Sequence, residues 1–371
     1  MEYNKKIKVI ISGGGTGGHI FPAIAIANTL KGKVEGIEIL FVGAKGKMEM
    51  GKVKTAGYPI EGLWISGLQR RLTYKNISVP FKIISSLLKS NKVINKFKPD
   101  VVVGVGGYAS WAVVKVASFK AIPTLIQEQN SFPGKSNINL SLKVNKICVA
   151  FSGMEKYFPE SKIVLTGNPV RQEVVNIENK KEEALKYFDF EPGKKVLLAI
   201  GGSLGARTIN ESIKKYLELF AQENIQIIWQ TGNHYFETAK VAANNFSGNN
   251  IRVMNFIERM DMAYSAADII VSRAGAISVS ELCIIGKPAV LIPSPNVAED
   301  HQTKNALTLV KSKAAILIND SDCRSVLGET IIKLFNDDAE RIMLSKNIKT
   351  LALPHAADAI ADEVIALANR K

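Results

Sequence analysis

The 371-residue chain carries 48 lysines and arginines against 34 aspartates and glutamates, and 46% of its residues are hydrophobic. This length suggests two domains, and the ordinary composition argues against a disordered chain. Three widely spaced cysteines argue against a disulfide framework or a zinc site and favour a reducing cytosol. The first residues lead into a strand-like segment without a signal-peptide core, and no apolar run approaches the roughly 18–20 residues of a membrane span.

Short apolar runs alternate with helical segments along the chain, a pattern typical of parallel sheets covered by helices on both faces. We expect two Rossmann-like, doubly wound α/β domains, over 1–167 and 168–350, with a C-terminal helix in 351–371 that packs back on the first domain. A ligand is expected in the cleft between the domains, at the carboxyl ends of the strands. The expected strands are 7–11, 37–42, 100–105, 124–126, 146–149, 195–200, 225–230, 268–272, 289–292 and 315–318.

Glycine-rich turns follow the first predicted strand of each half, at 13–18 and 201–206. The first turn satisfies G-x-G-x-x-G, but a dinucleotide site also needs an acid at the end of the second strand, and 41–45 contains none. The Walker pattern of P-loop NTPases is absent. Backbone N–H groups at such turns and at helix N-termini can bind phosphate without a metal. The plain structural alternative is that these glycines only permit tight turns.

The positive charge is concentrated in the first half, where residues 1–168 hold 24 basic and 9 acidic side chains. Residues 62–99 contain no acid, and apolar residues recur there at helical spacing. A basic amphipathic helix of this kind can lie on an anionic membrane surface. An ordinary surface helix is the alternative, and no RNA motif or DNA-reading helix supports a nucleic-acid partner. The residues expected at the membrane are Phe81, Lys82, Leu88 and Lys89.

Further motifs are more specific, and together with the first glycine turn they resemble the MurG family of two-domain (GT-B) inverting glycosyltransferases. These enzymes add N-acetylglucosamine to an undecaprenyl-pyrophosphate-linked muramyl pentapeptide in peptidoglycan synthesis. The resemblance implies a peripheral enzyme at the cytoplasmic face of the plasma membrane, with partners among cell-wall synthesis and division proteins. It runs from the first strand to near the C-terminus, through 13–23, 103–110, 128–130, 167–171, 272–282 and 293–306.

The resemblance also implies roles for individual residues toward the donor, UDP-N-acetylglucosamine. Ser203 would contact the diphosphate, the Ile257 backbone would lie against uracil, and Glu281 would accept hydrogen bonds from the ribose hydroxyls. Gln302 would reach the sugar, and Tyr108 would belong to the acceptor side. The remaining residues expected around the donor are Thr16, Gly17, Gly18, Asn130, Arg171, Ala276, Ile277, Ser278, Val279 and Ser280.

An inverting displacement needs a base that takes the proton of the acceptor hydroxyl. His19 ends the first glycine turn, and histidine titrates near neutral pH, which suits this work. A capping or packing role is the alternative for His19. Glu128 is the second candidate, either as the base or as the group that orients His19.

No cofactor or metal is expected. Asp320-Ser321-Asp322 has the Asp-x-Asp form of metal-dependent sugar transferases, but its place before a helix favours turn and N-cap roles. A UDP-sugar epimerase, which shares the two-domain plan, is the nearest alternative enzyme.

Overall fold

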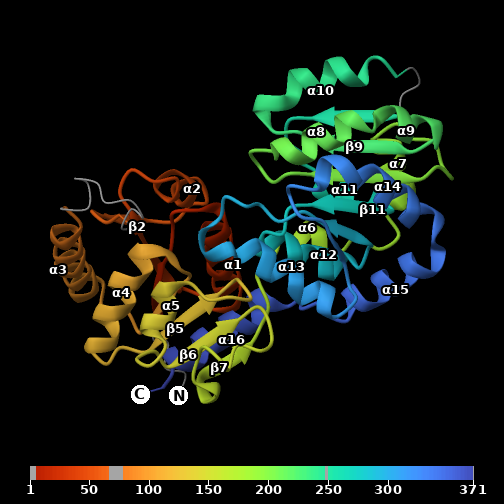
Figure 1. Cartoon of the computed structure of the whole chain (residues 1–371). Helices are drawn as coiled ribbons and strands as arrows, with labels where there is room; N and C mark the ends of the chain where they lie inside the picture. The colour runs from red at the N-terminus through yellow and green to blue at the C-terminus, as the bar shows by residue number, and fades with distance from the viewer. Residues whose placement is uncertain (1–5, 67–77, 247–249, 371) are drawn as a thin grey trace. The chain divides into compact units, whose positions relative to one another are not determined.

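The computed structural model describes residues 6–66, 78–246 and 250–370. Its contacts divide the chain into two compact units (Figure 1). Unit 1 comprises residues 1–170 together with 354–371, and unit 2 comprises residues 171–353. The first unit is therefore built from both ends of the chain, with the second unit inserted as one continuous segment.

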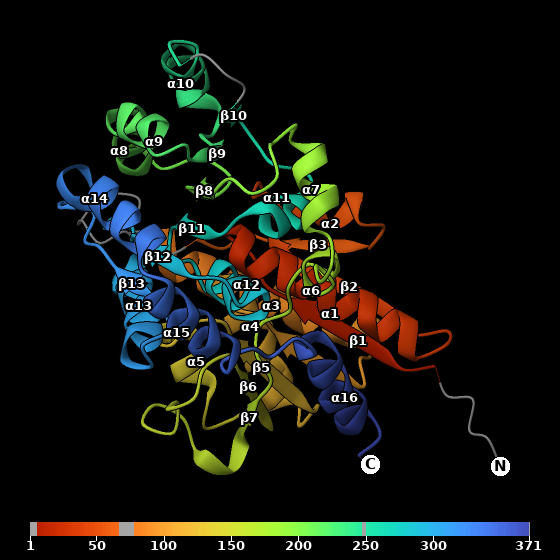
Figure 2. The same cartoon turned by 90° about the vertical axis from the view of Figure 1, so that its right-hand side faces the viewer.

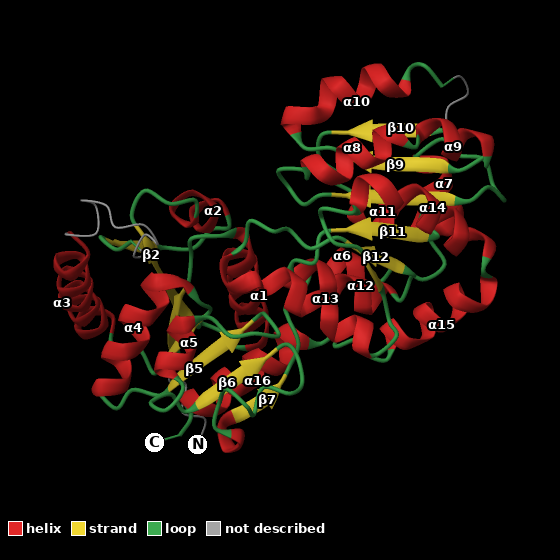
Figure 3. Ribbon diagram, viewed as in Figure 1, coloured by secondary structure: helices red, strands yellow, loops and turns green. Residues whose placement is uncertain are grey.

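Unit 1 is a seven-stranded parallel sheet in the order β3-β2-β1-β4-β5-β6-β7, with helices on both faces (Figure 3). The reversal of strand order beside β1 is the topological switch point at which doubly wound sheets bind ligands. Its elements are β1 (Lys8–Ser12), α1 (Gly17–Lys33), β2 (Glu38–Ala44), α2 (Glu49–Thr55), β3 (Ile60–Leu63), α3 (Val79–Phe97), β4 (Val101–Gly104), α4 (Gly107–Phe119), β5 (Thr124–Glu128), α5 (Lys135–Leu140), β6 (Lys146–Val149), β7 (Ile163–Leu165) and α16 (Ala356–Ala368).

Alternate side chains of each central strand enter different cores, because successive side chains of a strand point to opposite faces. Val9 and Ile11 of β1 belong to a cluster that includes α1 and α16. Ile10 belongs to a second cluster, which includes α3, α4 and α5. The chain's last helix thus covers the same face as its first helix, and Figure 2 shows α16 near α1.

Unit 2 is a six-stranded parallel sheet in the order β10-β9-β8-β11-β12-β13. The doubly wound parallel architecture expected from the sequence is confirmed in both units. The elements of unit 2 are α6 (Gln172–Val175), α7 (Lys181–Tyr187), β8 (Val196–Ile200), α8 (Arg207–Lys215), α9 (Leu217–Gln222), β9 (Gln226–Gln230), α10 (Phe236–Ala243), β10 (Ile251–Met254), α11 (Met260–Ala266), β11 (Ile269–Ser272), α12 (Ala276–Ile285), β12 (Ala289–Leu291), α13 (His301–Lys311), β13 (Ile316–Leu317), α14 (Cys323–Asn336) and α15 (Asp338–Lys349).

All three cysteines, Cys148, Cys283 and Cys323, are free and buried. Burial raises the pKa of the Cys148 and Cys283 thiols to about 12, so these side chains act as apolar packing groups. No helix within the described residues is long and apolar enough to cross a bilayer.

Candidate active site

Two glycine-containing loops of unit 1 pack directly against each other at the carboxyl ends of β1 and β4. A Cβ at Gly107 would lie 2.7 Å from the carbonyl oxygen of Gly14, and Gly107 also has a positive φ of 85°. A Cβ at Gly106 would lie 2.8 Å from Nε2 of His19. Glycine is therefore required at both positions, and the His19 ring lies close against this second loop.

The hydrogen bonds of His19 favour one tautomer of its ring. Nδ1 lies 2.9 Å from the carbonyl oxygen of Gly14 and 3.4 Å from the hydroxyl of Thr16. A carbonyl oxygen can only accept, so Nδ1 carries the proton and donates to it. The neutral imidazole then has its lone pair on Nε2, which can take up a proton. Gly17 and Gly18 open α1 beside it, and the side chain of Thr16 does not cap the helix start, so its first N–H groups can point at an anion.

Glu128, the other candidate for the base, is 2% exposed and serves the loop that follows β5. Its carboxylate accepts hydrogen bonds from the backbone N–H groups of Asn130 and Gly134, and from the side chain of Asn137 at 2.8 Å. The described contacts of His19 go instead to Gly14 and Thr16. The hypothesis that Glu128 orients His19 therefore finds no support in this geometry, whereas Glu128 does fix Asn130.

Glu49 is a residue that the sequence analysis missed. It starts α2, is 1% exposed, and accepts hydrogen bonds from the backbone N–H groups of Ala44 at 3.0 Å and Gly15 at 3.2 Å. Its carboxylate thus fastens the first glycine turn to the end of β2. The sequence carried no signal for this role, because an acid in the first turn of a helix is ordinary.

Helix α3 presents an apolar stripe to solvent. Phe81 is 65% exposed, Leu88 is 67% exposed, and both line a shallow hollow along the helix. Lys82 and Lys89 differ from the expectation, because both reach back to their own unit. Lys82 donates to the Ser66 hydroxyl, and Lys89 donates to the Gly62 carbonyl oxygen and pairs with Glu61. Tyr108, at the start of α4, is also exposed.

The second glycine turn lies at the carboxyl end of β8 in unit 2. Gly205 has a φ of 77°, and a Cβ there would lie 1.9 Å from the carbonyl oxygen of Thr231. The Gln230 side chain donates to the Gly202 carbonyl oxygen at 3.0 Å. Ser203 is exposed at the tip of the turn, where its hydroxyl can reach a ligand.

Helix α12 begins at Ala276 after Gly275 and ends before Gly286, whose left-handed backbone forms its C-cap. The side chains of Ala276, Ile277, Ser278 and Ser280 are partly exposed at its N-terminal end. Val279 requires a correction. Its side chain is fully buried and its N–H donates to the Gly275 carbonyl oxygen, so we remove it from the set of donor contacts.

The Glu281 carboxylate is held by two partners inside unit 2. Arg171 forms a two-pronged ion pair with it, through Nε to Oε1 and Nη2 to Oε2, both at 2.9 Å. The hydroxyl of Tyr264 donates to Oε2 at 3.0 Å. The side chain of Glu281 is 4% exposed and that of Arg171 is 40% exposed, so the arginine forms the outer layer of the cluster.

Two further expected donor residues lie on other loops of unit 2. The Gln302 side-chain oxygen accepts from the backbone N–H of Ser294 at 2.8 Å, which ties α13 to the loop after β12. The Ile257 side chain is buried, so only its backbone can meet a ligand.

The Asp320-Ser321-Asp322 segment forms the expected turn before α14 with Asp322 at the N-cap position, but no side chain of it caps the helix. Asp320 pairs with Arg273 at 2.5 Å and accepts from the Thr208 hydroxyl. Asp322 does precede α14, but its carboxylate accepts from Asn319 and Ser321 rather than from the helix. Within the described ranges, no group of three or more His, Cys, Asp or Glu side chains could hold a metal ion.

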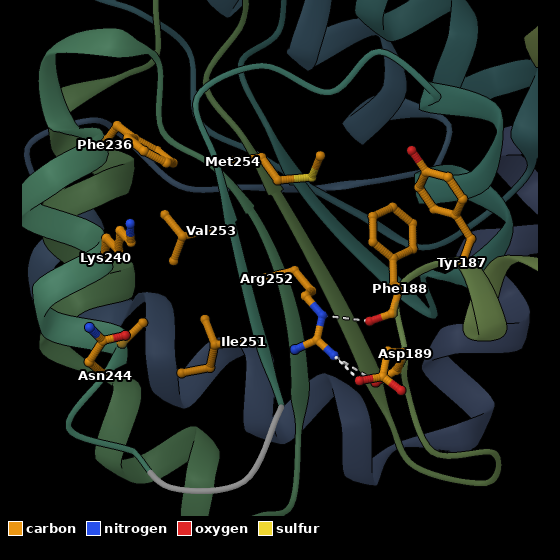
Figure 4. Close-up of a pocket in the computed structure, with 11 residues that line it drawn as sticks. Tyr187, Phe188, Asp189, Phe236, Lys240, Asn244, Ile251, Arg252, Val253 and Met254 are labelled. Carbon is orange, nitrogen blue, oxygen red and sulfur yellow. Dashed lines mark hydrogen bonds and ion pairs between the residues drawn. The ribbon is translucent and has the colours of Figure 1, made fainter.

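A separate hollow lies over the edge strand β10, between α10 and the Tyr187–Asp189 segment (Figure 4). Arg252 crosses it to donate to the carbonyl oxygens of Phe188 and Asp189. None of the expected site residues lines this hollow.

Comparison with known proteins identifies the family. The N-terminal domain model of glycosyltransferase family 28 matches residues 9–149, and the C-terminal domain model of the same family matches residues 196–360. This chain belongs to glycosyltransferase family 28. It is 55% identical, over 98% of both chains, to the UDP-N-acetylglucosamine–N-acetylmuramyl-(pentapeptide) pyrophosphoryl-undecaprenol N-acetylglucosamine transferase of Flavobacterium psychrophilum.

Solved structures agree with this assignment. The crystal structure of Acinetobacter baumannii MurG matches with a TM-score of 0.81 and 30% identity, over 97% of this chain and 99% of that one. The expected GT-B fold is thereby confirmed. A UDP-GlcNAc 2-epimerase from Neisseria meningitidis matches with a TM-score of 0.65 at 15% identity, over 98% of this chain and 100% of that one, which is a likeness of fold alone.

Proposed function

We propose that this protein transfers N-acetylglucosamine from UDP-N-acetylglucosamine to the 4-hydroxyl of undecaprenyl-pyrophosphoryl-N-acetylmuramyl-pentapeptide. The product is the lipid-linked disaccharide used in peptidoglycan synthesis. The observation that carries this proposal is the near-full-length similarity to family 28 relatives that bear this activity in their names. The epimerases are related to this chain at the level of fold only, so they are the weaker alternative.

In this proposal unit 2 binds the donor. The N-terminus of α12 and the 201–206 turn supply backbone N–H groups toward the diphosphate, with the Ser203 hydroxyl beside them. Glu281 accepts the ribose hydroxyls, and Gln302 reaches the sugar. Fixed N–H donors that point at the leaving diphosphate stabilise the charge that develops there as the glycosidic bond breaks.

Unit 1 holds the acceptor and the base. His19 takes the proton of the attacking hydroxyl on Nε2, while the Gly14 carbonyl oxygen holds Nδ1–H and stabilises the imidazolium that forms. The N–H groups at the start of α1 lie beside this ring, and we assign those of Gly17 and Gly18 to the acceptor's pyrophosphate and not to the donor, to which the resemblance had assigned them. Glu128 is buried under its own loop and acts by fixing Asn130.

The exposed apolar stripe of α3 supports a membrane-facing role for unit 1. A lipid-linked acceptor stays in the bilayer, whereas a nucleotide sugar is water-soluble, so the enzyme must work at the surface where both are present. We assign the protein to the cytoplasmic face of the plasma membrane as a peripheral enzyme. Phe81 and Leu88 would enter the interface, with Lys92 and Lys96 as exposed cations on the same helix.

The decisive assay follows UDP release from UDP-N-acetylglucosamine with and without the lipid-linked muramyl pentapeptide. We expect release only with the acceptor, together with formation of the disaccharide lipid. His19→Ala should lower kcat by about 10²–10⁴-fold and leave UDP affinity unchanged, because a general base acts on the chemical step. Conversion of the sugar without acceptor would instead establish an epimerase.

The same assay tests metal dependence. We expect turnover to persist in excess chelator, because the proposed diphosphate contacts are N–H groups and a hydroxyl. Loss of activity that manganese or magnesium restores would contradict this expectation.

A further inference from the structure

Tyr264 lies beneath the proposed donor site, although no motif pointed to it. It belongs to α11, is 1% exposed, and donates its hydroxyl to Oε2 of Glu281 at 3.0 Å. A buried tyrosine hydroxyl requires a polar partner, and here that partner is an ionisable carboxylate on another helix. The contact joins α11 to α12 at the residue proposed to bind the ribose.

The partners of Glu281 differ in how firmly they are held. A carboxylate offers about four lone-pair sites, of which Arg171 uses two and Tyr264 uses one. The ribose 2′- and 3′-hydroxyls together need two sites, so the donor must displace at least one prong of Arg171. Arg171 is 40% exposed and can swing outward, whereas Tyr264 is enclosed in the core. Tyr264 is therefore the partner that stays.

The hydroxyl of Tyr264 also keeps its proton at any working pH. Burial, reinforced by the negative charge of Glu281, raises the pKa of Tyr264 well above its ordinary value. The group is thus a permanent hydrogen-bond donor to Glu281.

We propose that Tyr264 is a positioning residue for ribose recognition. Its hydroxyl holds the Glu281 carboxylate in the one orientation that meets both ribose hydroxyls, and the enzyme thereby selects ribonucleotide donors over 2′-deoxyribonucleotide analogues. This inference rests on the proposed function, in which Glu281 accepts the ribose. Without the Tyr264 hydroxyl, the Glu281 carboxylate must be fixed in its orientation each time a ribose binds. This ordering lowers the affinity only of a donor whose ribose 2′-hydroxyl binds the carboxylate.

The test compares the affinities of UDP and 2′-deoxy-UDP, measured by calorimetry on the full chain. We expect the wild type to prefer UDP by about tenfold or more, because a hydrogen bond to a charged group is lost in the analogue. Tyr264→Phe should reduce this preference to within about threefold by weakening UDP alone, with kcat at saturating donor changed less than about twofold. Tyr58→Phe is the matched control, since it removes a hydroxyl that donates to Asn28 at 2.7 Å in unit 1.

Glu281→Gln separates the failure of this inference from the failure of the proposed function. If the wild type shows no preference for UDP, or Glu281→Gln retains it, then Glu281 does not read the ribose and the proposed donor site is wrong. If Glu281→Gln loses the preference and Tyr264→Phe keeps it within twofold of wild type, Tyr264 has only a structural role, and the proposed function stands.

Two unnatural residues at position 264 extend the test and decide it if Tyr264→Phe does not fold. 4-Aminophenylalanine restores an N–H donor at the place of the hydroxyl, and 4-fluorophenylalanine fills the same space without a donor. We expect the amino variant to recover the preference for UDP and the fluoro variant to lack it. Equal preferences in the two variants would overturn the inference.

Discussion

The two glycine turns occupy equivalent places, each after the strand that opens its unit, but they are held in different ways. The 13–18 turn is fastened by a charged side chain, because Glu49 accepts the N–H of Gly15. The 201–206 turn is interlocked with neighbouring backbone, since Gly205 and Gly232 each leave no room for a Cβ. Both turns therefore pack closely against neighbouring backbone, and the first turn has the Glu49 carboxylate as an additional, electrostatic fastening.

Because of this difference, the two turns should respond differently to added side-chain volume and to loss of a charged hydrogen-bond acceptor. The 201–206 turn, which is packed against backbone, should be destabilised by added side-chain volume and little affected by a change of charge. The 13–18 turn should be destabilised by removal of the Glu49 carboxylate, but little affected by added volume at a residue that faces solvent. A Cβ at Gly15 would have no heavy atom within 4 Å, unlike one at Gly205.

The largest expected effect comes from adding a methyl group to each turn. Gly205→Ala should lower the free energy of unfolding by about 4 kcal/mol or more, because left-handed strain is joined by a clash with the Thr231 carbonyl oxygen. Gly15→Ala, at a φ of 88°, should cost only the strain, about 1–2 kcal/mol. Urea unfolding measures both, and equal losses would remove the contrast between the turns.

The second-largest loss of stability is expected from removal of the Glu49 carboxylate. Glu49→Ala should cost about 3 kcal/mol of stability, because two backbone N–H groups lose their charged acceptor. It should also raise the acceptor KM and leave UDP affinity unchanged, because the loosened turn belongs to unit 1. Glu38→Ala is the control, since that exposed carboxylate pairs with Lys8 on the surface. A change in UDP affinity would contradict the assignment of the first glycine turn to the acceptor.

A buried cation gives unit 2 a pH dependence of its own. The Lys287 ammonium donates to the carbonyl oxygens of Ser265 and Ala267, and burial lowers its pKa to about 8. Between pH 8 and 10.5 the unfolded chain binds more protons at this group than the folded chain, so stability should rise with pH there. We expect a rise of about 2 kcal/mol relative to Lys287→Met, which lacks this group. If the stabilities of the wild type and Lys287→Met change equally with pH in this range, the lowered pKa of Lys287 is contradicted.

The smallest expected effect compares exposed apolar side chains in the two units. Phe81→Ser with Leu88→Ser should weaken binding to anionic vesicles by about tenfold, because these side chains would bury apolar surface in the interface. Ile342→Ser removes an equally exposed side chain from unit 2 and should leave vesicle binding unchanged. Equal binding by all three proteins would show that α3 does not face the membrane.

The sequence predicted the central strands well and the sheet edges poorly, for a physical reason. Strands β3, β7 and β10 were missed; each is a short edge strand in which at least half of the residues are not fully buried. The edge strand β13 was expected, because it lies in the apolar run 315–318. Strands buried on both faces form continuous apolar runs, whereas edge strands do not, so only the former give a clear signal.

The candidate site shows a similar limit. Motifs indicated the loops and Glu281, because such residues form recognisable local patterns. They could not indicate Tyr264, which lies 17 residues before its partner, or Glu49, which lies 34 residues after Gly15. Residues that position a site act through contacts with segments distant in the sequence, and these contacts can be seen only in a structure.

The insertion of unit 2 between the two parts of unit 1 has a consequence for synthesis on the ribosome. Ile360, Ala361 and Val364 of α16 complete the core against α1 and β1, so the unit that is translated first lacks part of its interior until the last residues emerge. Unit 2 is continuous and needs no later segment. Domains usually fold in the order in which they are made. Here unit 2 can finish first, and the nascent unit 1 exposes one apolar face throughout that interval.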